Sequence, residues 1–249
     1  MPRLSITAIV PTWNEEDLIQ PTLAGLRAGG VDQILVVDGG SGDGTLARAR
    51  ALADGVLQTE GGLFAQLNHA ARDASGDVLL FHYADVEFPR FGAEAIERAL
   101  DRGAVAGAFS LAFASDRMRY RVIARGANLR NRLGLGPFGD QSIFVQKDVF
   151  RAAGGFDPGA FLEDLDLVRR LKRAGRFAIL DARVKASVRR WEANGFLPTL
   201  YEHWRLTLLH LLGTGKRGGK ASTRARTLRT TRLPVPPQTV DDAVPERDP

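Results

Sequence analysis

Hydrophobic residues in the first 85 positions fall into short clusters, and the longer stretches between them repeat apolar residues every three or four positions. Short apolar and β-branched clusters are typical of buried strands, and the three-to-four spacing is typical of helices that pack on one face. The pattern predicts strands in "LSITAIVPTW", stopped by Pro11, and in "VDQILVVDGG", "GVLQTE" and "DVLLFHY". It predicts helices in "EEDLIQPTLAGLRAGG", "GDGTLARARALA" and "LFAQLNHAARDA". Strands that alternate with helices indicate a parallel sheet covered on both faces, an α/β fold.

The second half of the chain follows a different pattern. Strands are predicted in "GAVAGAFSLAF" and "QSIFVQKDVF", with the arginine-rich helix "RMRYRVIARGANLRNRLG" between them. A helix beginning near Leu162 covers "FLEDLDLVRRLKRAG", and "FAILDARVKASVRRW" is predicted as a final pair of strands. Residues 196–213 form an amphipathic helix with one apolar stripe: Leu197, Leu200, Trp204, Leu208 and Leu211. The composition of 214–249, basic and then Pro-rich and acidic, predicts a disordered tail.

The net charge of +5 is unevenly distributed along the chain. Residues 216–232 hold seven Lys or Arg and no acid, whereas the first 215 residues carry a net charge of only +1. This near-neutral globular part argues against a nucleic-acid-binding domain. The chain has no cysteine, which excludes disulfides and thiolate metal sites and suits a reducing compartment. With neither a signal-peptide pattern nor an apolar run of about 20 residues, we expect a cytoplasmic protein.

Polar side chains gather where three of the predicted strands end. Thr12, Asn14 and Glu15 follow the first strand, Asp38 ends the second, and Asp85 follows the strand in "DVLLFHY". Parallel strands end at a common edge of the sheet, where ligands bind in folds of this type. We therefore expect these side chains to converge on one binding site.

The segment "DGGSGDGT" follows a strand and opens a helix, as a dinucleotide-binding fingerprint does. The spacing G-x-G-x-x-G, counted from Gly40, requires glycine at position 45, which is Thr45. A redox dinucleotide enzyme is therefore disfavoured. The remaining readings are a ligand site at Asp38 and its glycines, or an acid that only caps the turn.

Six segments, "IVPTWNEE", "ILVVDGGSGDGT", "GDVLLF…AD", "GDQSIFV", "GGF…FLEDLDLVRRL" and "VRRW", occur in the order seen in family 2 glycosyltransferases with the GT-A fold. The resemblance covers about residues 4–213 and is greatest to a small bacterial subgroup linked to arsenosugar biosynthesis and radical-SAM/selenodomain gene neighbourhoods. It implies a Rossmann-like, mostly parallel sheet with a nucleotide-binding half at about 1–100, an acceptor half at about 101–213, and a tail at 214–249. The implied activity is that of a hexosyltransferase, which moves a sugar from a nucleotide-diphosphate donor, UDP being the commoner expectation, to a small-molecule or lipid-linked acceptor.

The resemblance also assigns residues to the donor site. They are Pro11, Thr12, Asn14, Glu15, Asp38, Gly39, Gln66, Asn68 and Asp85. Among them, Asp38 matches the acid that recognises the base or ribose. Asp85 matches the last acid of the D-x-D element, which holds Mn²⁺ or Mg²⁺ against the donor diphosphate. Both cations prefer carboxylate and phosphate oxygens as ligands.

On the acceptor side, Asp164 matches the catalytic base that accepts the proton of the acceptor hydroxyl. Acids in the first turn of a helix are also favoured by its dipole whatever their function, and Asp166 is expected to be structural or solvated. The remaining residues implied for the acceptor and diphosphate side are Gly139, Asp140, Gln141, Glu163, Arg189, Arg190 and Trp191.

The chain departs from the subgroup at three positions. Leu63 and Ala65 stand where two phosphate-binding arginines are usual, and Tyr83 stands where a histidine is usual. These losses favour a degenerate binding protein as the alternative to an enzyme. A nucleotidyltransferase is a weaker alternative, because "PTWNEE" lacks that class's glycine-rich basic loop. The neighbouring His82 is expected to be structural, since strand alternation points it away from the ligand side.

The helix at 196–213 has two interpretations. In the first, which we favour, its apolar stripe packs on the catalytic domain. In the second, the helix and the basic run up to 232 lie together on an anionic membrane surface.

Overall fold

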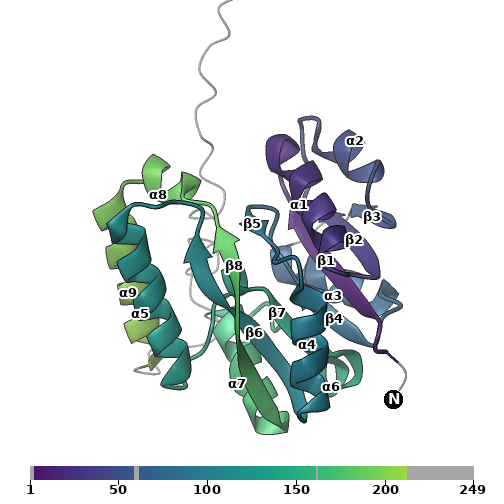
Figure 1. Ribbon diagram of the computed structural model, residues 1–249. Helices are drawn as coiled ribbons and strands as arrows, with labels where there is room; N and C mark the ends of the chain where they lie inside the picture. The colour runs from purple at the N-terminus through teal and green to yellow at the C-terminus, as the bar shows by residue number, and fades with distance from the viewer. Residues whose placement is uncertain (1–2, 59–61, 161, 212–249) are drawn as a thin grey trace, which may run out of the picture.

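The computed structural model describes residues 3–58, 62–160 and 162–211 (Figure 1). Its strands are β1 (Ile6–Thr12), β2 (Gln33–Asp38), β3 (Gly55–Gln58), β4 (Val78–Phe81), β5 (Val86–Glu87), β6 (Ala104–Phe113), β7 (Ile143–Gln146) and β8 (Arg176–Ala186). Its helices are α1 (Glu16–Ala28), α2 (Thr45–Arg50), α3 (Leu63–Asp73), α4 (Gly92–Asp101), α5 (Met118–Arg132), the single 3-10 turn η1 (Gly139–Gln141), α6 (Lys147–Ala152), α7 (Glu163–Ala174), α8 (Arg189–Ala193) and α9 (Phe196–Leu211).

The strands form one sheet in the order β3-β2-β1-β4-β7-β6-β8-β5. The first four strands are parallel, since β1 pairs with β2 and β4, and β2 pairs with β3. β6 is parallel to β8, whereas β7 is antiparallel to both β4 and β6. The carboxyl ends of β1, β2 and β4 therefore lie at one edge. This confirms the α/β fold with a mostly parallel sheet and helices on both faces.

Strand alternation builds a hydrophobic core on each face of the sheet. On β1, Ile6, Ala8 and Val10 face the core that α1 and α4 cover, while Ile9 faces the core that α3, α6 and α7 cover. β2 and β4 divide their side chains in the same way. Strands buried on both faces read as continuous apolar runs, which is why the sequence revealed them.

Several predicted element boundaries are wrong. β1 continues through Pro11, which pairs with Val37 of β2; its pairing with β4 ends at Ile9, so a proline there disrupts little. The strand predicted through "QKDVF" ends at Gln146, and α6 follows, because a short apolar pattern fits a strand and a helix equally well. The predicted final pair of strands is the single strand β8 followed by α8.

The sequence reading also missed α4 and the two-residue strand β5. The signal for α4 was present, because its buried residues Ala93, Ile96, Ala99 and Leu100 recur at helical spacing. β5 is fixed by its pairing with Ala186 and Lys185 of β8, about a hundred residues later, so no local pattern announces it.

Three of the four stripe residues of α9 whose side chains are described are not packed on the domain, and the fourth, Leu200, is half-buried. Leu197, Trp204 and Leu208 are 72%, 64% and 57% exposed, so the favoured expectation for this helix is wrong. Within residues 3–58, 62–160 and 162–211, no helix is long and apolar enough to cross a bilayer. The predicted disordered tail at 214–249 and the last two residues of the predicted helix lie outside the described residues.

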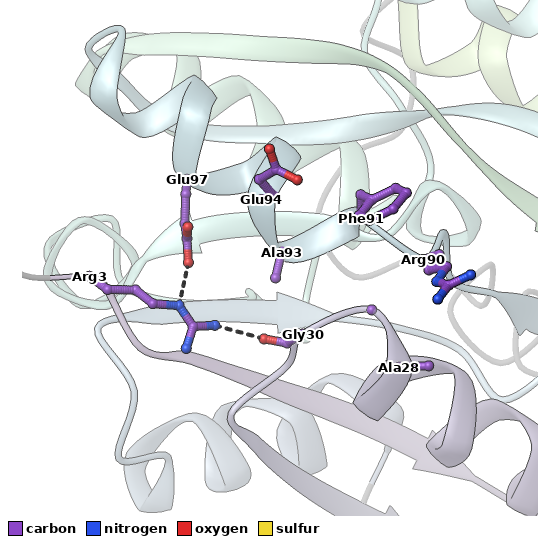
Figure 2. Close-up of a pocket in the computed structure, with 9 residues that line it drawn as sticks. Arg3, Ala28, Gly30, Arg90, Phe91, Ala93, Glu94 and Glu97 are labelled. Atoms are coloured by element: carbon purple, nitrogen blue, oxygen red, sulfur yellow. Dashed lines mark hydrogen bonds and ion pairs between the residues drawn. The ribbon is translucent and has the colours of Figure 1, made fainter.

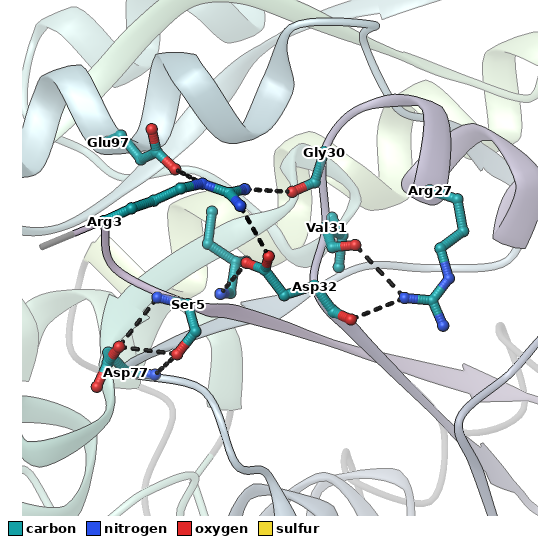
Figure 3. Close-up of polar contacts among 9 residues, drawn as sticks. Arg3, Ser5, Arg27, Gly30, Val31, Asp32, Asp77 and Glu97 are labelled. Carbon is teal, nitrogen blue, oxygen red and sulfur yellow. Dashed lines mark hydrogen bonds and ion pairs between the residues drawn. The ribbon is translucent and has the colours of Figure 1, made fainter.

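A polar network joins the start of β1 to the loops beside it (Figure 3). Arg3 donates hydrogen bonds to Glu97 at 2.8 Å, to Asp32 at 3.0 Å and to the carbonyl oxygen of Gly30 at 3.0 Å. Asp77 accepts from the amide of Ser5 at 2.9 Å and from its hydroxyl at 2.7 Å. The network ties the first strand to α1, to α4 and to the start of β4.

Replacing Asp77 with alanine is expected to lower the free energy of unfolding by about 1 kcal/mol at pH 7, because two hydrogen bonds to a charged, solvent-exposed acceptor are lost. The Ser5 amide and then its hydroxyl hold the pKa of Asp77 below its usual value of 3.8. The stabilisation is therefore present above about pH 3.8 and is lost as the pH falls through the lower native pKa. Urea unfolding at pH 7 and pH 3 measures both effects. Asp148→Ala, which changes a fully exposed acid, is the control; an equal loss in both variants would contradict the prediction.

Candidate functional site

The loops that follow β1 and β2 are held together by side-chain to backbone hydrogen bonds. The backbone amide of Asn14 donates to Ser41 Oγ at 2.9 Å, and the side-chain Oδ1 of Asn14 accepts from the Gly42 amide at 2.9 Å. The Glu15 amide donates to Thr45 Oγ1 at 2.8 Å. Asn14 has φ of 54°, a left-handed conformation that asparagine tolerates better than most residues. These bonds shape one continuous surface at the carboxyl edge of the sheet.

Asp38 is completely buried beneath this surface. Its carboxylate accepts from the amides of Gly40 and Ser41, each at 2.8 Å, and from Ser41 Oγ at 2.5 Å. The Thr12 hydroxyl lies 3.4 Å from it. Asp38 therefore shapes the loop, in which Gly39 and Gly40 are exposed.

Across the edge, two carboxylates lie close to two arginines. Arg189 donates to Glu15 Oε2 at 2.5 Å, which ties the loop after β1 to α8. Burial raises the pKa of Glu15, the ion pair with Arg189 opposes this, and the nearby Asp85 carboxylate raises it further. The carbonyl of Asp85 accepts from the Ser187 amide at 2.9 Å, so β5 holds the acid beside the segment that carries Arg189 and Arg190.

The cluster suits a divalent cation held jointly by protein and ligand. No group of three or more acidic or histidine side chains gathers as a metal site within the part of the chain that the structure describes. Mg²⁺ and similar cations commonly bind proteins through one or two carboxylates and complete their shell with water and substrate phosphates. Asp85, with Glu15 beside it, offers carboxylate oxygens of this kind.

Asp164 lies in the first turn of α7 and is buried. Its Oδ2 accepts a hydrogen bond from the Gly139 amide at 3.1 Å. A β-carbon on residue 139 would lie 2.9 Å from this oxygen and 2.7 Å from the hydroxyl of Tyr83. Only glycine at 139 therefore allows Asp164, η1 and Tyr83 to meet so closely.

Other predicted site residues are engaged in protein contacts. Asn68 uses both ends of its amide on Phe156, at 2.7 and 2.9 Å, and Gln141 donates to the carbonyl of Phe109 at 3.0 Å. Trp191 is buried among aromatic rings, with ring centres 5.7 to 6.3 Å away. These three residues bond to, or pack on, parts of the protein that lie next to the predicted site.

The remaining predicted residues lie at the edges of the same region. The amide nitrogen of Gln66 would be 3.7 Å from a β-carbon built on Gly39, so Gln66 packs under the glycine loop. Glu163 is buried beside Asp164 at the start of α7, and Asp140 is half-buried in η1. The structure thus gathers the donor-side and base-side residues at one edge of one sheet.

Sequence reasoning missed Arg130 of α5, which borders the base side of the site. Its guanidinium lies 4.3 Å from the ring centre of Phe138, and burial lowers its pKa while Asp140 opposes that effect. Its Nε is buried with no hydrogen-bond partner among the described residues. Because α5 is rich in arginine, no sequence signal separated this half-buried arginine from the exposed ones.

The structure confirms two residues as structural. His82 is buried, with Nε2 2.9 Å from the carbonyl of Val86 and Nδ1 2.8 Å from Ser142 Oγ. The carbonyl can only accept, so Nε2 carries the hydrogen and Nδ1 accepts from the serine hydroxyl. Asp166 forms ion pairs with Arg169 at 3.1 Å and with Arg170 at 2.9 Å.

A cavity of about 290 Å³ lies between the end of α1 and the start of α4 (Figure 2). Its walls include Arg3, Gly30, Phe91 and Glu97. Arg3 is already bonded to Glu97 and Gly30, and neither Asp85 nor Asp164 lines the cavity. We assign it no part in the site.

The fold and the position of the site define a class of protein. A mostly parallel sheet with acids and glycine loops gathered beyond its carboxyl ends is typical of α/β proteins that bind nucleotides. The family profile of Glycosyl transferase family 2 matches residues 7–149. The chain therefore belongs to glycosyl transferase family 2.

Solved structures with the same fold are distant in sequence. A mannosyltransferase from Pyrobaculum calidifontis, in complex with GDP-Man and Mn²⁺, matches with a TM-score of 0.63 and 21% identity over 92% of this chain and 70% of its own. Glucosyl-3-phosphoglycerate synthase from Mycobacterium tuberculosis, in complex with Mn²⁺, UDP and phosphoglyceric acid, matches with a TM-score of 0.56 and 20% identity over 87% and 80%. TarS of S. aureus matches with a TM-score of 0.58 and 17% identity over 90% and 69%. No curated protein matches the sequence.

Proposed function

We propose that this protein transfers a hexose from a nucleoside-diphosphate donor to an acceptor hydroxyl. The observation that supports the proposal is the presence of a charged cluster and a buried carboxylate at one edge of the sheet. Glu15, Asp85 and Arg189 form a charged cluster on the donor side, and Asp164 is held by Gly139 on the other side. Family membership supports the same activity.

The donor would lie over the glycine loop after β2, with its diphosphate toward Asp85. Exposed backbone at Gly39 and Gly40 allows a close approach by the nucleotide, and Arg189 and Arg190 are exposed beside the acid. Arginine binds phosphate oxygens in a bidentate manner. Arg189 can therefore exchange its contact with Glu15 for a contact with the diphosphate of a bound donor. UDP is our first choice of nucleotide, and GDP is the second.

Asp164 would act as the general base. The acceptor oxygen forms a bond to the anomeric carbon, the bond from that carbon to the diphosphate oxygen breaks, and the hydroxyl proton passes to the carboxylate. The hydrogen bond from the Gly139 amide orients the carboxylate of Asp164, which would receive the proton. A single displacement of this kind inverts the anomeric configuration.

A divalent cation, Mn²⁺ or Mg²⁺, would bind at Asp85 and neutralise the charge that develops on the departing diphosphate. The carboxylate oxygens of Asp85 and of the adjacent Glu15 suit this hard cation. The solved mannosyltransferase and synthase structures both contain Mn²⁺ with their nucleotides, which supports the choice of metal.

The acceptor, as we propose it, is a small molecule or a lipid-linked molecule that enters beside η1. Arg130 and Asp140 would flank this entrance, and the predicted residues Gln141 and Glu163 are buried behind it. The division into a donor half at about 1–100 and an acceptor half at about 101–213, the cytoplasmic location, and membership in the arsenosugar-linked subgroup remain proposals drawn from the sequence.

The alternative function is a binding protein that holds a nucleotide without turnover. The observation that favours it is the start of α3, where Leu63 packs on a hydrophobic core and Ala65 is exposed, so neither position offers a cation to a phosphate. The nucleotidyltransferase alternative has no comparable observation in its favour.

Nucleotide binding tests the donor site directly. Uridine or guanosine diphosphate at about 100 times its dissociation constant, with Mn²⁺, is expected to stabilise the wild type by about 2.7 kcal/mol, measured by thermal unfolding. Asp85→Ala is expected to lose this metal-dependent stabilisation, because the cation loses its protein ligand. Glu87→Ala removes an exposed acid two residues away and is the control that should retain it. No stabilisation of the wild type by any nucleotide, with or without Mn²⁺, would refute the donor site.

A further inference from the structure

Two adjacent helices leave an unusual number of large apolar side chains in solvent. Eight such residues are 57% to 72% exposed on α5, just after it, or on α9: Met118, Val122, Leu129, Leu133, Leu197, Tyr201, Trp204 and Leu208. Singly exposed apolar residues need no explanation, but a group of this kind on two neighbouring helices indicates an interaction surface.

The two helices lie side by side at one edge of the molecule (Figure 1). Their first turns touch, because the ring of Phe196 lies 5.9 Å from the ring of Tyr120 and 5.2 Å from the guanidinium of Arg119. The apolar residues recur along α9 at intervals of three or four, so they form one stripe on that helix. We call the eight residues together the α5–α9 face.

The charge of α5 is strongly positive. α5 contains five arginines and no acid. Arg121, Arg125 and Arg132 are exposed, and the ion pairs that Arg121 and Arg132 make with Asp116 and Asp181 are long, at 3.9 and 3.8 Å. These guanidinium groups are therefore free to exchange their partners for another anion.

We propose that the α5–α9 face binds the surface of an anionic lipid bilayer, with the apolar stripe at the level of the headgroups and acyl chains. Basic residues beside an apolar helical face are the composition of interfacial helices. Tyr201 and Trp204 fit this boundary, since aromatic rings with a polar atom favour it. The arginines of α5 complement the negative charge of the headgroups.

Charge disfavours a second copy of the chain as the occupant. In a two-fold dimer built on this face, α5 of one copy would meet the same surface of the other, which brings like charges together. A bilayer offers the opposite charge and an apolar layer at once. This proposal is independent of the sugar transfer proposed above, because no residue of the face belongs to the donor or base site.

Vesicle co-sedimentation tests the proposal with the full chain. We expect the wild type to bind vesicles of phosphatidylcholine and phosphatidylglycerol at about three to one, and to bind pure phosphatidylcholine at least about tenfold more weakly. The triple variant Val122→Ser, Leu197→Ser, Trp204→Ser should bind the anionic vesicles at least about tenfold more weakly than the wild type. Because all three positions are exposed, the variant should keep the wild-type melting temperature.

Two further variants separate the contributions. Arg121→Gln with Arg125→Gln should weaken binding to anionic vesicles and reduce its sensitivity to salt. Phe91→Ser, which alters an equally exposed aromatic residue away from the face, should change nothing. Nucleotide stabilisation should be the same in all of these variants, which separates loss of the face from damage to the donor site.

Three results would overturn the proposal. They are failure of the wild type to bind anionic vesicles, unchanged binding by the triple variant, and a dimer in solution that the triple variant converts to a monomer. The last result would assign the face to a second copy.

Discussion

Asp164→Asn is expected to lower the rate of sugar transfer by about 10²- to 10⁴-fold, the usual contribution of a general base. Asparagine keeps the size of the side chain and an oxygen that can accept the Gly139 amide, so the local geometry should persist. What it loses is the ability to take the acceptor proton. Hydrolysis of nucleotide sugars to the free sugar, with water as the acceptor, measures the effect before the natural acceptor is known.

The matched control for this prediction is Asp166→Asn, two residues along the same helix. Asp166 is bonded to Arg169 and Arg170 and is expected to affect stability rather than turnover. Both variants should still be stabilised by a nucleotide with Mn²⁺, which shows that the donor site is intact. Wild-type hydrolysis by the Asp164 variant would remove this residue from the role of base. Absence of hydrolysis in the wild type, with nucleotide binding retained, would favour the binding protein.

Acid is expected to destabilise the fold through His82 between about pH 6.5 and pH 4. Burial lowers the pKa of His82 from 6.5 to about 4, because the charged ring would be desolvated. Between these values the unfolded chain binds a proton that the native state does not, so the free energy of unfolding falls as the pH falls. A shift of this size corresponds to a loss of about 3 kcal/mol between pH 6.5 and pH 4. Glu15, whose pKa is raised, changes stability in the opposite direction nearer its usual value of 4.5.

Urea unfolding at intervals between pH 7 and pH 4 measures this slope. His82→Gln removes the titrating ring, so its stability should depend less on pH even though its stability at pH 7 is lower. His69→Gln, which alters a partly exposed histidine on α3, is the control variant. A wild-type slope that persists in the His82 variant would assign the acid sensitivity to other groups.

The proximity of Glu15 and Asp85 at one edge of the sheet could be predicted from the sequence. Glu15 and Asp85 follow β1 and β4, and parallel strands bring their ends to one edge whatever the details of packing. For Asp38 and Asn68 the structure shows contacts within the protein, and their role toward a donor stays a prediction. Both lie where a donor residue was expected, yet Asp38 bonds its own loop and Asn68 bonds Phe156. A polar side chain looks the same in sequence whether its partner is a ligand or the backbone.

The sequence by itself determined the alternation of strands and helices, because each strand of the parallel half is buried on both faces and each covering helix on one. It also determined that acids and glycines follow β1, β2 and β4. The tertiary structure alone decided that Gly139 packs between Tyr83 and Asp164, that Arg130 is half-buried near Asp140, and that Leu197, Trp204 and Leu208 of α9 stay exposed. The physical reason is the range of the contacts. Periodicity reports on neighbours within a turn or a strand, whereas these arrangements depend on residues that are between 10 and about 80 positions apart.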